Sequence, residues 1–320
     1  METHVCVCGA SALELYRSSK RLIPELLDKS RTGQVNGLGT APRLMLADDM
    51  TRLGVSTKPY HLLIGGRNAG RQRDDVIRHA YSQLPPRALI RINKTCCVAS
   101  PELTFIQLAA SGTYDENELI ELGFELCGTY VLDSSWDGFT CTDEPLTSVE
   151  KIARMAARLR NHAGLPLAKR ALKHMRNFSN SPMETVLALL VSLPTSQGGL
   201  GLSPIAMNQA VRTAAGTRHV DVGFPNHKLG LEYMGKQHHS IEAAGRDDRR
   251  QNKLVGSGFT VLNVWYEDLA NEHLFQQFAD DLFHAMGKRR RIRAKGYAMK
   301  QQVLRAHLMP TVERFGLGSC

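Results

Sequence analysis

The spacing of hydrophobic residues predicts a small α/β domain in the first 145 residues. Residues 60–65 and 88–92 are short apolar runs that end in turn residues, which is typical of strands. Ser100 followed by Pro101 has the form of a helix N-cap with proline at the first helical position. Apolar residues recur at helical spacing over residues 115–127 and predict a second helix.

Helical patterns dominate residues 146–215, which we expect to lead into the next domain. Thr147-Ser-Val-Glu150 has the form of a capping box, and residues 167–177 predict a basic helix. Ser181-Pro-Met-Glu184 opens a third, apolar helix. Ser203-Pro204 predicts one more helix, which reaches about Ala214. These helices have the composition of packing elements.

After Gly216 the hydrophobic pattern changes from helical spacing to alternation at every second residue, which is typical of strands. Residues 219–224 and 229–234 alternate in polarity on either side of Pro225–Lys228, which predicts a hairpin with a four-residue loop. A charged helix (242–254), a strand (259–265) and an amphipathic helix that ends near Met286 follow. The order β-β-α-β-α predicts a compact domain over 216–287, followed by a basic tail over 288–320.

The predicted hairpin places two acids opposite each other. If Phe224 faces Leu229 across the loop, Asp221 faces Glu232, and glycines 223 and 230 lie beside them on the same face. Two carboxylates about 5 Å apart repel unless a cation, a proton or a basic group neutralises them. Their oxygen ligands suit Mg²⁺ or Mn²⁺, and the glycines would leave room for a substrate backbone. The alternative is the polar, solvent-facing side of an ordinary hairpin.

Composition and charge narrow the class of protein. The chain has 320 residues, of which 42% are hydrophobic, so two or more compact domains are expected. No apolar run approaches the ~20 residues of a membrane helix, and the N-terminus lacks the pattern of a secretion signal, so we expect a soluble cytoplasmic protein without a membrane partner. Most of the net charge of +9 lies after residue 287, where nine lysines and arginines accompany one acid. This tail is either a polyphosphate-binding segment or a solvated extension.

The seven cysteines give no zinc signature. Their number is odd and no C-x-x-C pair occurs, whereas zinc fingers and ribbons need two such pairs. We expect reduced, mostly buried thiols.

The hairpin and the segments that follow it resemble a known bacterial family. These segments are Val220-Asp-Val-Gly-Phe-Pro-Asn-His-Lys-Leu-Gly-Leu-Glu-Tyr-Met-Gly-Lys-Gln-His239, Asp247-Asp-Arg-Arg-Gln-Asn-Lys-Leu254 and Gly258-Phe-Thr-Val-Leu262. The family consists of uncharacterised proteins with a domain similar to very-short-patch-repair endonucleases, in the PD-(D/E)xK restriction-endonuclease-like superfamily. Glu125-Leu-Cys-Gly-Thr-Tyr130 and the segment from Ser181 are similar to the larger proteins that carry this domain, whose upstream regions resemble abortive-infection antitoxins. The resemblance covers most of residues 95–286.

The resemblance implies an α+β fold, a restriction-endonuclease-like mixed sheet flanked by helices, and a set of site residues. Asp221 matches the metal-binding aspartate, Glu232 the acid of the second strand, and His238 (or His239) a histidine that acts as general acid or base or orients water. Glu184 matches an acid on the preceding helix and would be a third metal ligand. Glu184 also fits a purely structural role, because it lies three residues after the cap Ser181.

One departure weakens the catalytic hypothesis. Met234 stands where the superfamily has a lysine, and a methionine cannot stabilise charge. Lys236 is the nearest substitute for that catalytic lysine. We therefore expect a Mg²⁺- or Mn²⁺-dependent DNA endonuclease or nickase, with a catalytically degenerate DNA-binding regulator of antitoxin type as the alternative. A scaffold for protein partners, in which the acids serve solubility, is the third hypothesis.

Two basic clusters are candidates for DNA contact. They are Arg249, Arg250 and Lys253 on the charged helix, and Arg289, Arg290 and Arg291 in the tail. Aspartates interleave with the first cluster, so a self-paired helix surface is the alternative there. A toxin or another component of a defence system is the protein partner that the antitoxin resemblance implies.

Overall fold

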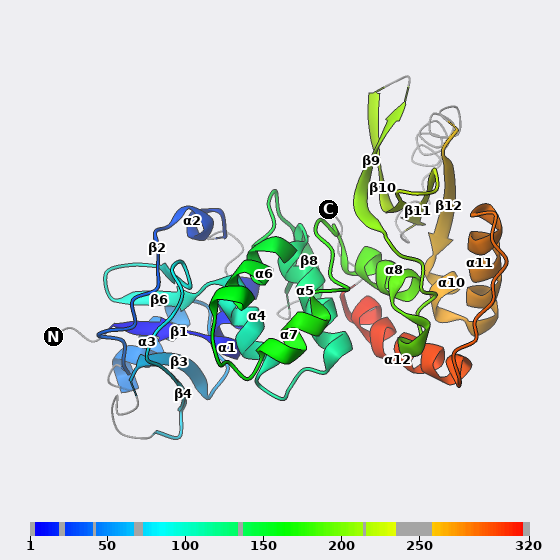
Figure 1. Ribbon diagram of the computed structural model, residues 1–320. Coiled ribbons are helices and arrows are strands. Elements are labelled where there is room, and N and C mark those ends of the chain that lie inside the picture. The colour runs from blue at the N-terminus through cyan, green and yellow to red at the C-terminus, as the bar shows by residue number, and fades with distance from the viewer. Residues whose placement is uncertain are drawn as a thin grey trace. The chain divides into compact units, whose positions relative to one another are not determined.

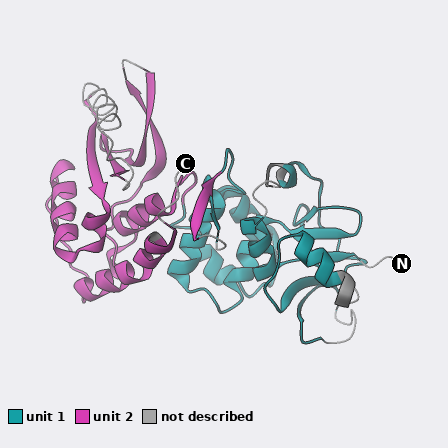
Figure 2. Cartoon of the chain, turned by 180° about the vertical axis from the view of Figure 1, so that it is seen from behind, with its two compact units in different colours: residues 1–136, 142–175 teal, residues 137–141, 176–320 magenta. Residues whose placement is uncertain are grey.

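The computed structural model describes residues 4–18, 23–40, 43–66, 73–133, 137–213, 216–234 and 258–315. These residues form two compact units (Figures 1 and 2). Unit 1 comprises residues 1–136 and 142–175, and unit 2 comprises residues 137–141 and 176–320. The helices expected over 146–215 are thus divided between the two units. None of the described helices is both long enough and apolar enough to cross a membrane.

Unit 1 contains a six-stranded sheet in the order β2-β5-β6-β1-β3-β4. Its strands are β1 (Val5–Val7), β2 (Arg31–Thr32), β3 (Tyr60–Gly65), β4 (Val76–Tyr81), β5 (Leu89–Arg91) and β6 (Cys96–Ala99). β1 runs parallel to β6 and antiparallel to β3, and β3 runs parallel to β4. The central strands β1 and β6 are apolar and buried along their whole length, as expected of strands inside a covered sheet.

The helices of unit 1 that follow Ser100 and Asp115 begin where the sequence predicts, whereas the cap expected at Thr147 lies one residue later, at Ser148. They are α1 (Gly9–Ser18), α2 (Ile23–Asp28), α3 (Arg43–Arg52), α4 (Pro101–Ala109), α5 (Glu116–Cys127), α6 (Val149–Arg158) and α7 (Leu165–Ala171); a further strand, β7, spans Tyr130–Asp133. Ser100 caps α4 by accepting the Leu103 N–H, and Asp115 forms a capping box with Glu118 at α5. The caps of α4 and α5 confirm the sequence-based expectation that helices begin there.

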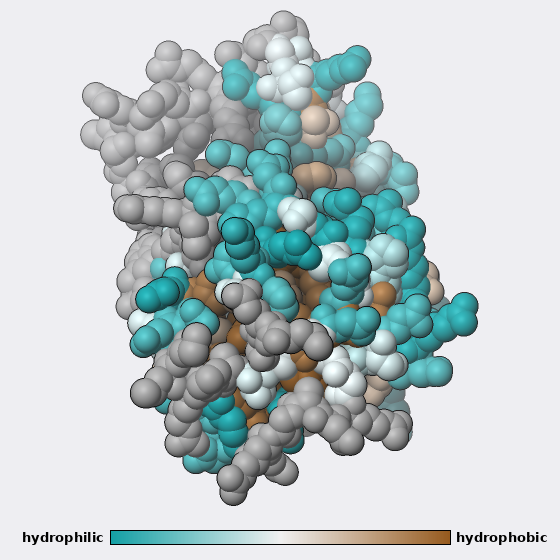
Figure 3. All heavy atoms as spheres, turned by 90° about the vertical axis from the view of Figure 1, so that its left-hand side faces the viewer, coloured by the Kyte–Doolittle hydropathy of each residue, from teal (hydrophilic) through white to brown (hydrophobic). Residues whose placement is uncertain are grey.

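One face of the molecule illustrates the polarity of its surface. Among the described residues on the face in Figure 3, hydrophilic side chains predominate, with hydrophobic side chains between them. Five cysteines are free and buried, as expected for reduced thiols: Cys6, Cys8, Cys96, Cys97 and Cys127. Cys141 is disulfide-bonded, so the expectation of reduced thiols is wrong there. Spacing along the chain does not reveal which thiols the fold brings together.

Unit 2 contains a four-stranded mixed sheet in the order β12-β11-β10-β9. The strands of this sheet are β9 (Ala206–Thr213), β10 (Gly216–Phe224), β11 (Leu229–Met234) and β12 (Thr260–Trp265). A further strand of unit 2, β8 (Gly138–Cys141), lies outside this sheet. β9, β10 and β11 are antiparallel neighbours, and β12 runs parallel to β11. Its helices are α8 (Pro182–Ser192), α10 (Tyr266–Ala270), α11 (Glu272–Ala285), α12 (Tyr297–Phe315) and the short 3-10 helix η1 (Thr195–Gln197). The chain is therefore α+β, with mixed sheets flanked by helices.

The helix expected from Ser203 to about Ala214 is wrong, because β9 occupies most of this stretch. Its residues pair with β10 from Thr213 opposite Gly216 to Ala206 opposite Gly223. A Ser-Pro pair predicts a helix from local geometry alone, whereas a whole ladder of hydrogen bonds with a neighbouring strand outweighs that preference.

The basic tail contributes a helix to the core of unit 2. α12 packs against α8, α10 and η1, and Leu304 and Leu308 are fully buried. Arg305 is also buried and donates to the carbonyl oxygens of Leu269 and Ala270, at 3.4 Å each, at the end of α10. Part of the positive charge of this segment therefore stabilises the fold.

Candidate functional site

The hairpin of β10 and β11 has the predicted register next to its loop, but the ladder ends at Val222 opposite Leu231, so the expected pairing of Asp221 with Glu232 is not part of it. Phe224 pairs with Leu229, and Gly223 pairs with Gly230. Four of the apolar side chains expected on the core face are almost completely buried: Val222, Phe224, Leu229 and Leu231. α8, itself buried along its whole length, packs against both strands. The helix before the hairpin and the hairpin itself thus form one core.

β10 departs from regular pairing at Asp221. On the side of β9, Val220 pairs with Gln209 and Val222 with Met207, while Asn208 between them has a left-handed φ of 46°. On the side of β11, the Asp221 carboxylate accepts the backbone N–H of Tyr233 at 2.8 Å. The carboxylate therefore lies between the two strands, in place of a main-chain carbonyl.

The glycine face of the hairpin is filled by side chains, so the expected room for a substrate backbone is wrong. A β-carbon on Gly223 would lie 1.8 Å from Gln209 Oε1, and one on Gly230 would lie 2.7 Å from Val220 Cγ2. Val220 packs here with Val211, Phe259 and Val261, although simple alternation places it on the opposite face. The distortion at Asn208 and Asp221 interrupts the two-residue period on which that expectation depends.

Glu184 and Asp221 are brought together. Glu184 lies in the first turn of α8, where its N–H donates to Ser181 Oγ at 3.2 Å and its carboxyl accepts the Asn180 N–H at 2.8 Å. The side chain is buried, and burial together with the negative charge of Asp221 raises the pKa of Glu184 to about 8. Glu184 is thus both part of the helix cap and the partner of a second acid.

Glu232 and Met234 follow on β11. Both are half-buried; Glu232 pairs with Asn263 and Met234 with Trp265 on β12. Oε1 of Glu232 is itself buried. Within the described residues, no three acidic, histidine or cysteine side chains are arranged to hold a metal ion. Lys236 and His238 lie outside the described residues.

Of the six basic residues predicted to contact DNA, the structure describes only the three tail arginines. Arg289 and Arg291 are exposed, while Arg290 is half-buried and binds Asp280 at 3.0 Å and Gln276 at 2.7 Å. The structure therefore leaves two of the three tail arginines on the surface and uses the third between α11 and the tail. Arg249, Arg250 and Lys253 lie outside the described residues.

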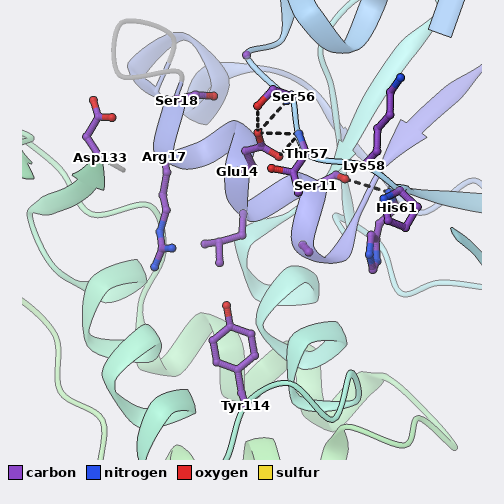
Figure 4. Close-up of a pocket in the computed structure, with 14 residues that line it drawn as sticks. Ser11, Glu14, Arg17, Ser18, Ser56, Thr57, Lys58, His61, Tyr114 and Asp133 are labelled. Carbon is purple, nitrogen blue, oxygen red and sulfur yellow. Dashed lines mark hydrogen bonds between the residues drawn. The ribbon is translucent and has the colours of Figure 1, made fainter. Parts of the chain in front are cut away.

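Unit 1 contains a pocket of about 460 Å³ that the sequence does not reveal (Figure 4). Figure 4 shows Glu14 directed at Ser56 and Thr57, whose backbone N–H groups it accepts at 2.8 and 3.1 Å. Arg17, which also lines the pocket, forms a bidentate pair with the buried Glu125. The charges of Glu14 and Arg17 are therefore satisfied within the fold, which indicates a structural role.

Comparisons with known proteins add no relative to this picture. Neither the family models, nor the curated proteins, nor the solved structures contain a match to the chain.

Proposed function

We propose that unit 2 is a metal-dependent DNA endonuclease or nickase with a restriction-endonuclease-like fold. The observation that carries this proposal is the position of Asp221, which lies near the buried Glu184 of α8 and bonds the backbone of β11 next to Glu232. Acids from a helix and a strand that are distant in sequence meet at this point. The mixed sheet flanked by helices supports the same fold class.

The two neighbouring acids fit a divalent cation. Mg²⁺ is usually held by one or two carboxylates, with water and substrate phosphates completing its octahedron, so a three-residue cage is not required. Glu184 is buried and Asp221 is half-buried, so their carboxylates repel each other when both are ionised, and a cation would relieve that repulsion. We propose Glu184 and Asp221 as the direct metal ligands, with Glu232 acting through a water molecule bound to the cation, because these three described acids do not form a direct three-residue cage. A bound Mg²⁺ or Mn²⁺ would activate a water molecule and stabilise the charge of the scissile phosphate.

The remaining roles belong to residues around these acids. The N–H of Tyr233 holds the Asp221 carboxylate in place, and the cap of α8 holds Glu184. We propose His238 for proton transfer and Lys236 for the charge that Met234 cannot supply. Arg289 and Arg291, with Arg249, Arg250 and Lys253, would contact DNA phosphates in a sequence-independent way.

A second function is favoured by the closed glycine face. Gln209 and Val220 occupy the space in which a substrate strand would approach the hairpin, and Met234 replaces the expected lysine. These features fit a nuclease fold that has lost catalysis and binds DNA as an antitoxin-type regulator, with a toxin as its partner.

Cleavage of supercoiled plasmid separates the two functions. The purified chain is incubated with Mg²⁺, with Mn²⁺ or with chelator, beside Asp221→Asn, Glu232→Ala and the control Asp281→Asn, which neutralises an exposed acid on α11. The nuclease predicts metal-dependent nicking that both site variants lose by roughly a hundredfold or more and that the control keeps. Metal-independent DNA binding without cleavage, unchanged by the site variants, would support the regulator instead.

A further inference from the structure

A second pocket of unit 1, with a volume of about 1080 Å³, lies beside β4 and the loop between α6 and α7. Its lining includes His79, Tyr81, Arg158, Arg160 and His162. Within the described part of unit 1, no acidic side chain lines this pocket, and neither arginine forms an ion pair with a described carboxylate. The pocket thus differs from the one around Glu14 and Arg17, whose charges the fold satisfies.

The hydrogen bonds around Tyr81 fix the orientation of its partners. Gln107 on α4 accepts the Gly9 N–H through Oε1 at 3.0 Å, so its Nε2 is the atom that donates to the Tyr81 hydroxyl at 3.2 Å. His162 accepts the Gly164 N–H at its Nδ1, at 3.2 Å. Burial lowers the pKa of His162, which is therefore neutral at pH 7 and carries its one proton on Nε2.

The hydroxyl proton of Tyr81 follows from these assignments. His162 Nε2 lies 2.8 Å from the Tyr81 oxygen and, because it carries the proton, donates to that oxygen. Gln107 donates to the same oxygen, so both of its lone pairs are occupied. The O–H of Tyr81 must then point to a third partner, and Tyr81 lines the pocket. The fold thus holds a hydrogen-bond donor of fixed position at the wall of a basic pocket.

His79 of β4 also lines this pocket, and it contacts His61 of β3. His79 Nε2 and His61 Nδ1 are 3.0 Å apart and their rings stack. Burial, then the neighbouring His61 and His162, lowers the pKa of His79 to about 4, so this imidazole is neutral at pH 7. The positive charge of the pocket therefore comes from Arg158 and Arg160, and Tyr81 supplies a neutral donor. Arginines with a nearby hydroxyl donor are a common combination for phosphate groups.

We propose that this pocket of unit 1 binds a phosphate ester, with Tyr81 as the hydrogen-bond donor and Arg158 and Arg160 as the cations. The volume exceeds that of a single phosphate and admits a nucleotide-sized group. Two sources present this chemistry, a free nucleotide and the backbone of a nucleic-acid strand. The proposal does not depend on nuclease activity in unit 2.

Binding measurements on the full chain test the proposal. Calorimetry with inorganic phosphate and with AMP, and fluorescence anisotropy with a labelled single-stranded DNA of twelve nucleotides, are run on the wild type, Tyr81→Phe and the double variant Arg158→Gln/Arg160→Gln. Circular dichroism verifies folding. The matched control is Lys151→Gln/Lys169→Gln, which removes the same charge from exposed positions on α6 and α7 outside the pocket.

Tyr81→Phe is expected to weaken the binding of phosphate and AMP roughly tenfold, and the double arginine variant more strongly, while the control binds as the wild type does. If the variants lose AMP binding, the ligand of the pocket is a free nucleotide. If the variants lose binding only to the oligonucleotide, and the salt dependence of that binding falls by about two charges, the ligand is the backbone of a nucleic-acid strand. Tyr81→Phe also removes the hydroxyl that Gln107 and His162 bind within unit 1. If the Tyr81→Phe variant does not fold, the double arginine variant alone tests the proposal. Absence of binding by every probe, or binding that the folded arginine variant retains in full, overturns the proposal.

Discussion

At the scale of single residues, the most unusual group is a buried acid beside a second acid. Glu184 is 8% exposed, and its carboxyl accepts the Asn180 N–H, yet its pKa is raised to about 8. Burial is the largest cause and the charge of Asp221 the second. The fold therefore favours a neutral Glu184, although the hydrogen bond opposes this.

The raised pKa predicts how stability depends on pH. An acid whose pKa is higher in the folded state stabilises the fold fully below its unfolded value, near 4.5, and this contribution is lost as the pH rises through about 8. Glu184→Gln, which stays neutral, is therefore expected to match the wild type at pH 4 and to exceed it at pH 8.5, by a free energy of unfolding on the order of a few kcal/mol. Urea unfolding at the two pH values measures the difference.

The control for this pH series is Asp281→Asn, an exposed acid of the same unit. Its stability difference from the wild type is expected to change little between the two pH values. A Glu184→Gln variant whose advantage does not grow with pH would show that Asp221 and burial do not act on this carboxyl as described.

At the scale of elements, the start of α8 serves both stability and the site. Ser181 accepts the Glu184 N–H at 3.2 Å, as Ser148 accepts the Lys151 N–H at 3.3 Å at the start of α6. The two caps have the same geometry, but only the first carries a candidate metal ligand. A cap in unit 1 thus provides a matched reference for a cap in unit 2.

Replacing either cap serine is expected to cost about 1 kcal/mol of stability, because a backbone N–H in the first turn loses its acceptor. Ser181→Ala is further expected to weaken Mn²⁺ binding several-fold, since it also removes the 3.2 Å hydrogen bond from Ser181 Oγ to the Glu184 carboxyl. Ser148→Ala should leave Mn²⁺ binding unchanged. Thermal unfolding and Mn²⁺ titration followed by electron paramagnetic resonance measure the two effects; equal Mn²⁺ affinity in both variants would contradict a ligand role for Glu184.

At the scale of the whole molecule, the C-terminal segment combines a basic surface with a structural helix. Leu308 is completely buried, whereas Met299 on the same helix is 71% exposed. The sequence shows the charge of this segment but not its burial, because α12 covers α8, which lies more than a hundred residues earlier in the chain.

Leu308→Ala is expected to destabilise the protein by about 2–5 kcal/mol, through lost burial and the cavity that remains. Met299→Ala should change the stability by less than about 0.5 kcal/mol, because an exposed side chain loses little contact. Chemical unfolding of both variants checks the prediction. Equal stabilities would mean that α12 is an appendage and not part of the core of unit 2.

The sequence by itself determined the features that depend on neighbours along the chain. Caps at Ser100 and Ser181 mark the starts of helices, because the cap bonds an N–H three residues later. The loop length and the paired glycines set the register of β10 and β11. The positions of Asp221 and Glu232 on neighbouring strands follow from that register.

Only the tertiary structure decided the features that depend on distant residues. Ala206–Thr213 is a strand because β10 supplies its hydrogen bonds, and the irregularity at Asn208 and Asp221 turns Val220 onto the glycine face. Glu184 meets Asp221, and Tyr81 meets His162, across 37 and 81 positions of the chain. Such encounters leave no periodic trace in the sequence, because the packing of whole elements determines which side chains meet.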